Sequence, residues 1–362
     1  MPDQSAPAPR GPYWGNYASP ADRRACRTLI RHGSRSFFIA SLLLPKSVRQ
    51  PAYAFYAFCR LADDVIDLEL AERDAVDQLR RRLDGIYAGT PADIPADRAL
   101  ADTVRQFDVP RDLLDALIEG FAWDRDGRRF RSLGEVYGYS ARVAGSVGAV
   151  MSVLMGVRDA ESLARACDLG VAMQLTNIAR DVGEDAAAGR VYLPLEWMEE
   201  AGIDPAEFLE NPRHSPALAG VVERLLQAAA VLYLRAEPGI AALPTNCRPA
   251  IRAARMIYAE IGAEIAANGF DSMSRRAVVS KGRKLTLLAR AAAMSRQAPV
   301  QDPAVALAPA LVETQFLVQA AAQPDTIPLV TEGIDAKFAF MIDLFKRLEV
   351  RDRIASPTNR ES

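Results

Sequence analysis

The chain has 362 residues, half of them hydrophobic, and its 44 lysine and arginine residues against 46 aspartate and glutamate residues give a formal net charge of −2 at pH 7. Such a balance provides no basic field for nonspecific nucleic-acid binding, so we expect no nucleic-acid partner. The four cysteines have no CxxC spacing and only two histidines are present, which argues against a zinc site, a disulfide framework and mechanisms that need several imidazoles.

The N-terminal sequence MPDQSAPAPRGPYWGNY lacks a basic start followed by an apolar stretch, so we expect residues 1–18 to be a disordered lead-in and not a secretory signal. The longest uncharged stretch, Val143 to Val157, has about 15 residues, fewer than the roughly 20 that span a bilayer. We expect a cytoplasmic protein, with peripheral contact at the inner face of the membrane for product release as an alternative. The sequence indicates no particular oligomeric state.

The next segment, residues 19–295, has apolar residues at three- and four-residue spacing, Pro and Gly at the breaks, and no sustained alternation. This pattern predicts an all-α, single-domain helical bundle. The expected helices lie near residues 20–31, 46–67, 70–87, 98–106, 111–122, 132–155, 160–184, 215–236, 247–268 and 281–295. Residues 296–362 are rich in Pro and Ala and predict a partly helical appendage, with an amphipathic stretch near 335–348 and a disordered end.

The predicted helix 46–67 carries the first stripe of carboxylates. Asp63 and Asp67 are one turn apart, and Arg60 precedes Asp63 by three residues, so all three share one helix face. Two carboxylates at this spacing repel each other unless a cation lies between them.

The predicted helix 160–184 carries a second stripe, in the segment QLTNIARDVGED. Gln174, Asn177, Asp181 and Asp185 follow 3-4-4 spacing and offer only oxygen atoms as ligands, which is the donor set that Mg²⁺ prefers. Arg180 lies beside this stripe. Apolar residues surround both stripes, and because buried carboxylates are costly unless paired or metal-bound, we favour a metal cluster over two solvated helix faces.

Several separate segments together resemble the squalene and phytoene synthases, which condense two prenyl diphosphates head to head. They are GSRSFF (33–38), YAFCRLADDVID (56–67), YSARVAGSVG (139–148), QLTNIARDVGED with RVYLP (174–194), and a weaker region from Tyr258 to Lys284. The resemblance implies a fold of the isoprenoid synthase type, in which the helices surround a central cavity.

The resemblance also implies roles for individual residues. It places the metal ligands at Asp63, Asp67, Asn177, Asp181 and Asp185, and the catalytic residues at Asp63, Asp67, Asp181, Asp185, Arg60 and Tyr139. It places the substrate-binding residues at Ser34, Ser36, Tyr56, Arg60, Gln174, Asn177, Arg180, Tyr192, Tyr258 and Arg276. For Tyr56, Tyr192 and Tyr258, ordinary core packing is an equal alternative.

The implied reaction joins two geranylgeranyl diphosphates through a cyclopropyl diphosphate to phytoene, with Mg²⁺ (or Mn²⁺) and no nucleotide cofactor. Metal ions stabilise the charge on the departing diphosphate, and an apolar cavity protects the carbocation from water. Two alternatives stay open. One is a synthase of the squalene, presqualene or dehydrosqualene type that uses farnesyl diphosphate, and the other is a catalytically idle partner protein that binds prenyl lipids.

Overall fold

The computed structural model describes residues 17–68, 74–294 and 308–322, and within these it describes the side chains outside 65–68. The described part contains helices and no strand, so the prediction of an all-α bundle is confirmed. The helices are α1 (Pro20–Gly33), α2 (Arg35–Ser41), α3 (Lys46–Leu68), α4 (Ala75–Ala88), α5 (Pro95–Phe107), α6 (Arg111–Arg125), α7 (Leu133–Ser140), the π-helical turn η1 (Ala141–Gly145), α8 (Ser146–Leu154), α9 (Ala160–Ala187), α10 (Leu195–Glu200), α11 (Pro205–Glu210), α12 (Pro216–Ala242), α13 (Arg248–Ala267), α14 (Lys281–Met294), the 3₁₀ turn η2 (Val312–Thr314) and α16 (Gln315–Ala321).

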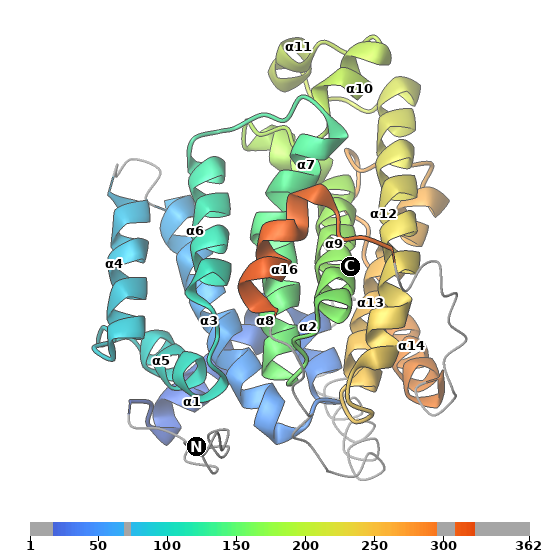
Figure 1. The fold of residues 1–362 in the computed structure, drawn as a ribbon. Coiled ribbons are helices and arrows are strands. Elements are labelled where there is room, and N and C mark those ends of the chain that lie inside the picture. Colours follow the sequence, from blue (N-terminus) through green and yellow to red (C-terminus); the bar gives the residue numbers. More distant parts are fainter. Residues whose placement is uncertain (1–16, 69–73, 295–307, 323–362) are drawn as a thin grey trace, which may run out of the picture.

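The long helix α9 lies at the centre of the bundle, between α8 on one side and α12 and α13 on the other (Figure 1). Its buried residues occur on nearly every face along the first two thirds of its length, as expected for a helix surrounded by others. Close approach is possible because Gly170 has no side chain: a Cβ there would lie 2.2 Å from the carbonyl oxygen of Ala144.

The helix predicted over 132–155 is present from Leu133 to Leu154, but the π turn η1 lies between its parts α7 and α8. Ala144, which packs on Gly170, lies inside that turn. A π turn inserts one residue and rotates the following side chains relative to those before it, and such turns often occur at functional sites. Sequence periodicity does not report this change because the apolar pattern continues through it.

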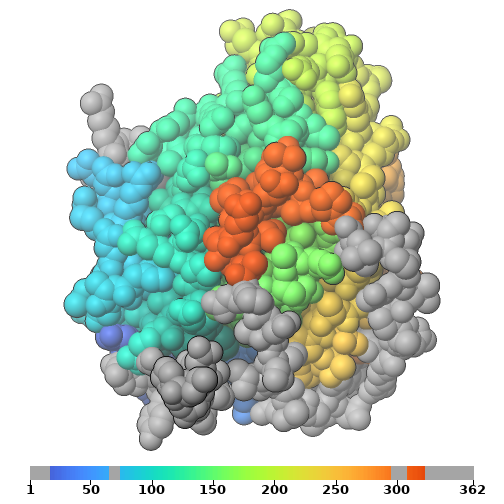
Figure 2. Space-filling model, viewed as in Figure 1, coloured from blue at the N-terminus to red at the C-terminus, as the bar shows by residue number. Residues whose placement is uncertain are grey.

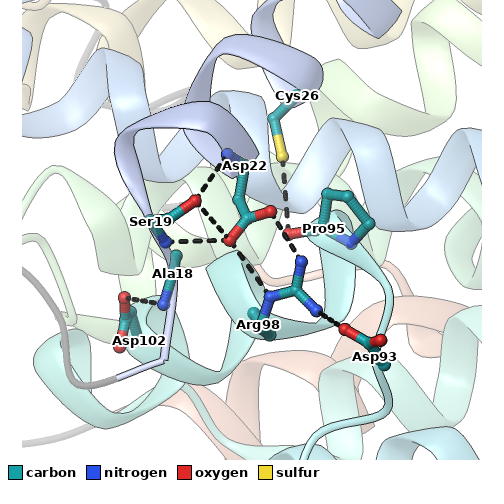
Figure 3. Close-up of polar contacts among 8 residues, drawn as sticks. All are labelled: Ala18, Ser19, Asp22, Cys26, Asp93, Pro95, Arg98 and Asp102. Atoms are coloured by element: carbon teal, nitrogen blue, oxygen red, sulfur yellow. Dashed lines mark hydrogen bonds and ion pairs between the residues drawn. The ribbon is translucent and has the colours of Figure 1, made fainter.

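The N-terminal helix α1 is fixed at its start by side-chain hydrogen bonds (Figure 3). Ser19 and Asp22 cap each other reciprocally, in the pattern of a capping box. The Asp22 carboxylate also accepts hydrogen bonds of 2.6 and 3.0 Å from Arg98 of α5, which in turn contacts Asp93. These bonds attach α1 to α5 and hold the pKa of Asp22 well below its usual value.

The short helices α2, α10 and α11 were not predicted from the sequence, because six or seven residues are too few to display a helical period. Helix α2 begins after Ser34, whose hydroxyl accepts a hydrogen bond of 3.3 Å from the Phe37 backbone N–H. Its residues Phe38 to Ser41 are buried, so tertiary packing stabilises a helix that would not form in isolation.

A segment near the C-terminus, residues 308–322, lies across the outside of α6, α8 and α9 (Figure 2). It contains η2 and α16, and its buried residues are Thr314, Leu317, Val318 and Ala321. The amphipathic stretch predicted near 335–348 lies outside the described residues.

Within the described residues, one helix, α12, is long and apolar enough to span a bilayer by length and composition, although we expected none. Core helices of bundles meet the same criterion, and α12 packs along α9 and α13 in this fold.

Candidate active site

The bundle encloses an apolar cavity of about 330 Å³, within the usual range of roughly 300–1,000 Å³ for ligand pockets. Its walls come from α2, α3, η1, α8, α9, α12 and α13, and consist of Phe, Leu, Ile, Met, Val, Ala and Gly side chains for most of their area. Polar groups that line it include Tyr56, Gln174 and Asn177. The cavity therefore combines a largely apolar lining with a few polar groups, several of them on α3 and α9.

The stripe predicted on α9 is present as a line of half-buried residues on an otherwise buried helix. Asn177 donates a hydrogen bond of 3.2 Å to Oε1 of Gln174. Its own Oδ1 is buried and accepts no hydrogen bond from any described residue. A buried carbonyl oxygen without a donor is costly, and a cation at this position would satisfy it.

One turn further, Asp181 is held between two arginines. Arg180 donates to both carboxylate oxygens at 2.7 and 2.6 Å, and Arg276 donates to the same two oxygens at 2.8 and 3.3 Å. Burial raises the pKa of Asp181, but the hydrogen bonds from the two guanidinium groups outweigh it, so the pKa lies below its usual value. The carboxylate is therefore ionised, and two cations predicted to bind diphosphate lie directly beside it.

The loop that carries Arg276 is positioned by Gly183. The Gly183 backbone N–H donates to the carbonyl oxygen of Ser272 at 3.1 Å, and a Cβ at Gly183 would lie 2.9 Å from that oxygen. At the start of the same loop, the Asp271 carboxylate accepts hydrogen bonds from the backbone N–H groups of Met273 and Ser274. Glycine in the acidic segment of α9 thus lets a distant part of the chain bring its arginine to Asp181.

The stripe predicted on α3 is described in part. Arg60 contacts Asp63 at 3.3 Å and Asp64 at 2.5 Å, and Tyr56, one turn earlier, lines the cavity. The side chain of Asp67 lies outside the described residues.

A further carboxylate that the sequence did not predict, Asp124 of α6, accepts hydrogen bonds from the hydroxyl groups of Tyr139 at 3.0 Å and Tyr192 at 2.7 Å. The two tyrosine rings stack with centroids 5.2 Å apart, and both stack on Phe130. Tyr139 and Tyr192, predicted as a catalytic and a substrate-binding residue, are therefore brought together by Asp124.

Asp124 connects the two stripes electrostatically. Burial raises its pKa to about 6, with the charge of Asp63 adding to the effect and the two tyrosine hydrogen bonds opposing it. Burial likewise raises the pKa of Asp185 to about 7, and the charges of Asp181 and Asp124 contribute. Carboxylates from α3, α6 and α9 thus lie close enough to repel one another, as expected for a site that binds cations.

Replacing Asp124 with Asn is expected to flatten the pH dependence of stability. The pKa rises from 3.8 to about 6 on folding, so the unfolded chain releases this proton first and the wild type loses stability as pH rises from about 4 to about 6. The variant lacks this titrating group, so it should lose less stability over the same pH range. Urea unfolding at about pH 4.5 and about pH 7 measures the difference, with Asp126→Asn as an exposed control. Equal losses in wild type and Asp124→Asn would contradict the assignment.

The donor set fits a hard divalent cation. It contains only oxygen atoms, it includes the unsatisfied Oδ1 of Asn177, and its carboxylates are mutually repulsive. Among the described residues, no three acidic, histidine or cysteine side chains lie close enough together to hold one metal ion. Both oxygens of Asp181 are occupied by arginines. The predicted metal ligands stay a prediction. For Asp181 to bind a cation, one of its carboxylate oxygens must give up its hydrogen bond to an arginine.

Of the other predicted substrate residues, Tyr258 lines the cavity, whereas Ser34 and Ser36 are not among its lining residues. Tyr258 stacks on Phe37 with ring centroids 5.1 Å apart, and has its pKa raised to about 12 by burial. Ser34 caps α2, and Ser36 is half-buried on that helix. Lys284, which was not predicted, lies near Arg180 and Arg35: burial and these two charges lower its pKa.

Comparison with known proteins identifies the family. A model of the squalene/phytoene synthases matches residues 30–283. The chain is 51% identical to phytoene synthase of Rhodobacter capsulatus over 341 residues, covering 92% of this chain and 97% of that protein. It is 52% identical to phytoene synthase of Cereibacter sphaeroides over 344 residues, covering 92% and 95%. A solved dehydrosqualene synthase matches with a TM-score of 0.70 at 32% identity, covering 76% of this chain and 97% of that one. The resemblance inferred from the motifs is confirmed, and the chain belongs to the squalene/phytoene synthase family.

Proposed function

We propose that this protein condenses two geranylgeranyl diphosphates head to head, through a cyclopropyl diphosphate, to phytoene, and so catalyses the first committed step of carotenoid biosynthesis. The observation that carries the proposal is the identity of 51–52% to two bacterial phytoene synthases over 92% of this chain. The apolar cavity, together with the carboxylates and arginines of α3 and α9, supports it, because each substrate has a long hydrocarbon chain and a diphosphate group.

In the proposed mechanism, the cavity binds the prenyl chains and the α3 and α9 residues bind the diphosphates. Arg60, Arg180 and Arg276 orient phosphate oxygens, while Asp63, Asp67, Asn177, Asp181 and Asp185 hold Mg²⁺. Bound Mg²⁺ would neutralise the charge that develops on the departing diphosphate. The apolar walls exclude water from the allylic cation, and the Tyr258 ring, stacked on Phe37, offers a π face to it.

Asp124 contributes a positioning role to this proposal. Its two hydrogen bonds fix the Tyr139 and Tyr192 rings near the carboxylates of α3 and α9. We also propose a cytoplasmic enzyme with peripheral membrane contact, because an apolar C40 product partitions from water into lipid.

The experiment supplies the purified protein and Mg²⁺ with geranylgeranyl diphosphate, and in parallel with farnesyl diphosphate with and without NADPH. A C40 hydrocarbon with a conjugated triene, formed from geranylgeranyl diphosphate alone, is the expected product. The match to a dehydrosqualene synthase favours the C15 substrate as a second candidate, and a C30 product from farnesyl diphosphate alone would establish it. No diphosphate release from either substrate would leave the prenyl-lipid-binding alternative.

A further inference from the structure

A second cavity, of about 450 Å³, lies between α1 and α3 and is strongly basic. Four of its residues come from α1 and four from α3, and both sets have the spacing i, i+3, i+4, i+7 that defines one helix face. We call it the α1/α3 groove, and its residues are Pro20, Arg23, Arg24, Arg27, Leu42, Lys46, Arg49, Gln50 and Tyr53. The two helix faces bring five cationic side chains to one concave surface.

Two carboxylates near α1 already have partners, and one of them pairs with a cation of the groove. Asp22 accepts its hydrogen bonds from Ser19 and Arg98, on the side of α1 that packs against α5 (Figure 3). Asp102 accepts from the backbone N–H groups of Tyr17 and Ala18, and lies 3.6 Å from Arg23.

The remaining four cations of the groove, Arg24, Arg27, Lys46 and Arg49, form no ion pair with a carboxylate within the described part of the chain. Arg49 donates weakly to the carbonyl oxygen of Leu42 at 3.4 Å, and the Arg27 guanidinium lies 6.0 Å from the centre of the Phe38 ring. Like charges at this density repel, and a bound anion would relieve the repulsion.

The groove is separate from the carboxylate stripe of α3. Lys46 precedes Asp63 by 17 residues on α3, which corresponds to about 25 Å along a helix. One hydrogen-bonded pair divides the two cavities: Ser41 lines the central cavity and Tyr53 lines the groove, and their hydroxyl oxygens are 3.0 Å apart. Because Ser41 donates to the Phe38 carbonyl oxygen, the Tyr53 hydroxyl donates to Ser41.

We propose that the α1/α3 groove is a binding site for a phosphate-bearing anion, distinct from the diphosphate end of the catalytic cavity. Arginine forks bind phosphate oxygens in pairs, and the volume of the groove exceeds the space that one phosphate group needs. The phosphate belongs either to the headgroup of an anionic membrane lipid or to a free phosphate ion. In the first case, binding orients the lower end of the bundle, where Figure 1 shows α1, toward the membrane surface.

The test uses the full-length protein and a triple variant, Arg24→Gln/Arg27→Gln/Lys46→Gln, which removes three exposed cations of the groove. Its control, Arg81→Gln/Arg213→Gln/Arg290→Gln, removes three exposed cations elsewhere. One arm measures co-flotation with phosphatidylglycerol vesicles against phosphatidylcholine vesicles. The other measures calorimetric binding of inorganic phosphate without divalent metal, and the melting temperature of each protein checks that it is folded.

If the ligand is a lipid headgroup, wild type and control bind phosphatidylglycerol vesicles and the groove variant binds roughly a hundredfold more weakly. If it is a free phosphate, wild type and control bind inorganic phosphate, none of the proteins binds vesicles, and the variant loses phosphate binding. Equal binding by the groove variant and the control in both arms, or binding of neither probe by the wild type, overturns the proposal.

Discussion

Replacing Asp181 with Asn is expected to lower the rate of phytoene formation by about 10²–10³-fold, because the variant loses an anionic oxygen that contacts two arginines and that we propose as a metal ligand. The change is nearly isosteric, so the local packing of α9 should persist. The Mg²⁺ concentration needed for half-maximal rate should rise as well, since an amide is a weaker ligand than a carboxylate. Initial rates at varied Mg²⁺ and saturating substrate measure both effects.

Glu184→Gln is the matched control, because it removes one negative charge from the same helix. The Glu184 carboxylate lies 3.2 Å from Arg276, but its side chain is 62% exposed, so we expect little change in either quantity. Circular dichroism and melting temperature distinguish loss of activity from loss of structure. If Asp181→Asn and Glu184→Gln behaved alike, Asp181 would have no special role in metal binding.

The parts of the site that the sequence predicts are those that depend on spacing within one helix. Gln174, Asn177, Asp181 and Asp185 fall on one stripe because an α-helix repeats every 3.6 residues, and the structure places them all on the half-buried face of α9. The same local rule accounts for the prediction of most of the long helices.

The parts that the sequence does not predict depend on contacts between distant segments. Asp124 lies in the last turn of an ordinary amphipathic helix, and only the folded chain brings Tyr139 and Tyr192 to its two oxygens. The position of Arg276 depends on the close approach of a loop to Gly183, and no spacing rule relates residues so far apart. In the same way, the basic groove combines two short arginine- and lysine-containing segments that appear unremarkable when taken separately.

A buried cluster of charged side chains connects the wall of the central cavity to the segment 308–322. Asp168 is fully buried on α9 and lies 3.1 Å from Nε of both Arg165 and Arg235. Each arginine also donates to the carbonyl oxygen of Pro309, at 3.3 and 2.7 Å respectively. Because Arg165 lines the cavity, this cluster holds part of the cavity wall and the segment 308–322 in one arrangement.

Asp168→Ala is therefore expected to lower the free energy of unfolding by about 3–5 kcal/mol, since it leaves two like charges facing each other, one of them on a buried side chain. Urea unfolding monitored by circular dichroism measures the change. Glu161→Ala, which removes an exposed carboxylate from the first turn of the same helix, should change stability by less than about 0.5 kcal/mol.

A second variant separates the unpaired charge from the small cavity that the truncation also creates. Adding Arg165→Met to Asp168→Ala removes the buried cation while keeping an unbranched side chain of similar length, so the double variant should be more stable than Asp168→Ala alone. If the double variant were less stable by the full cost of both changes, the loss in Asp168→Ala would come from packing. Recovery would instead show that Asp168 stabilises this part of the fold by neutralising Arg165 and Arg235.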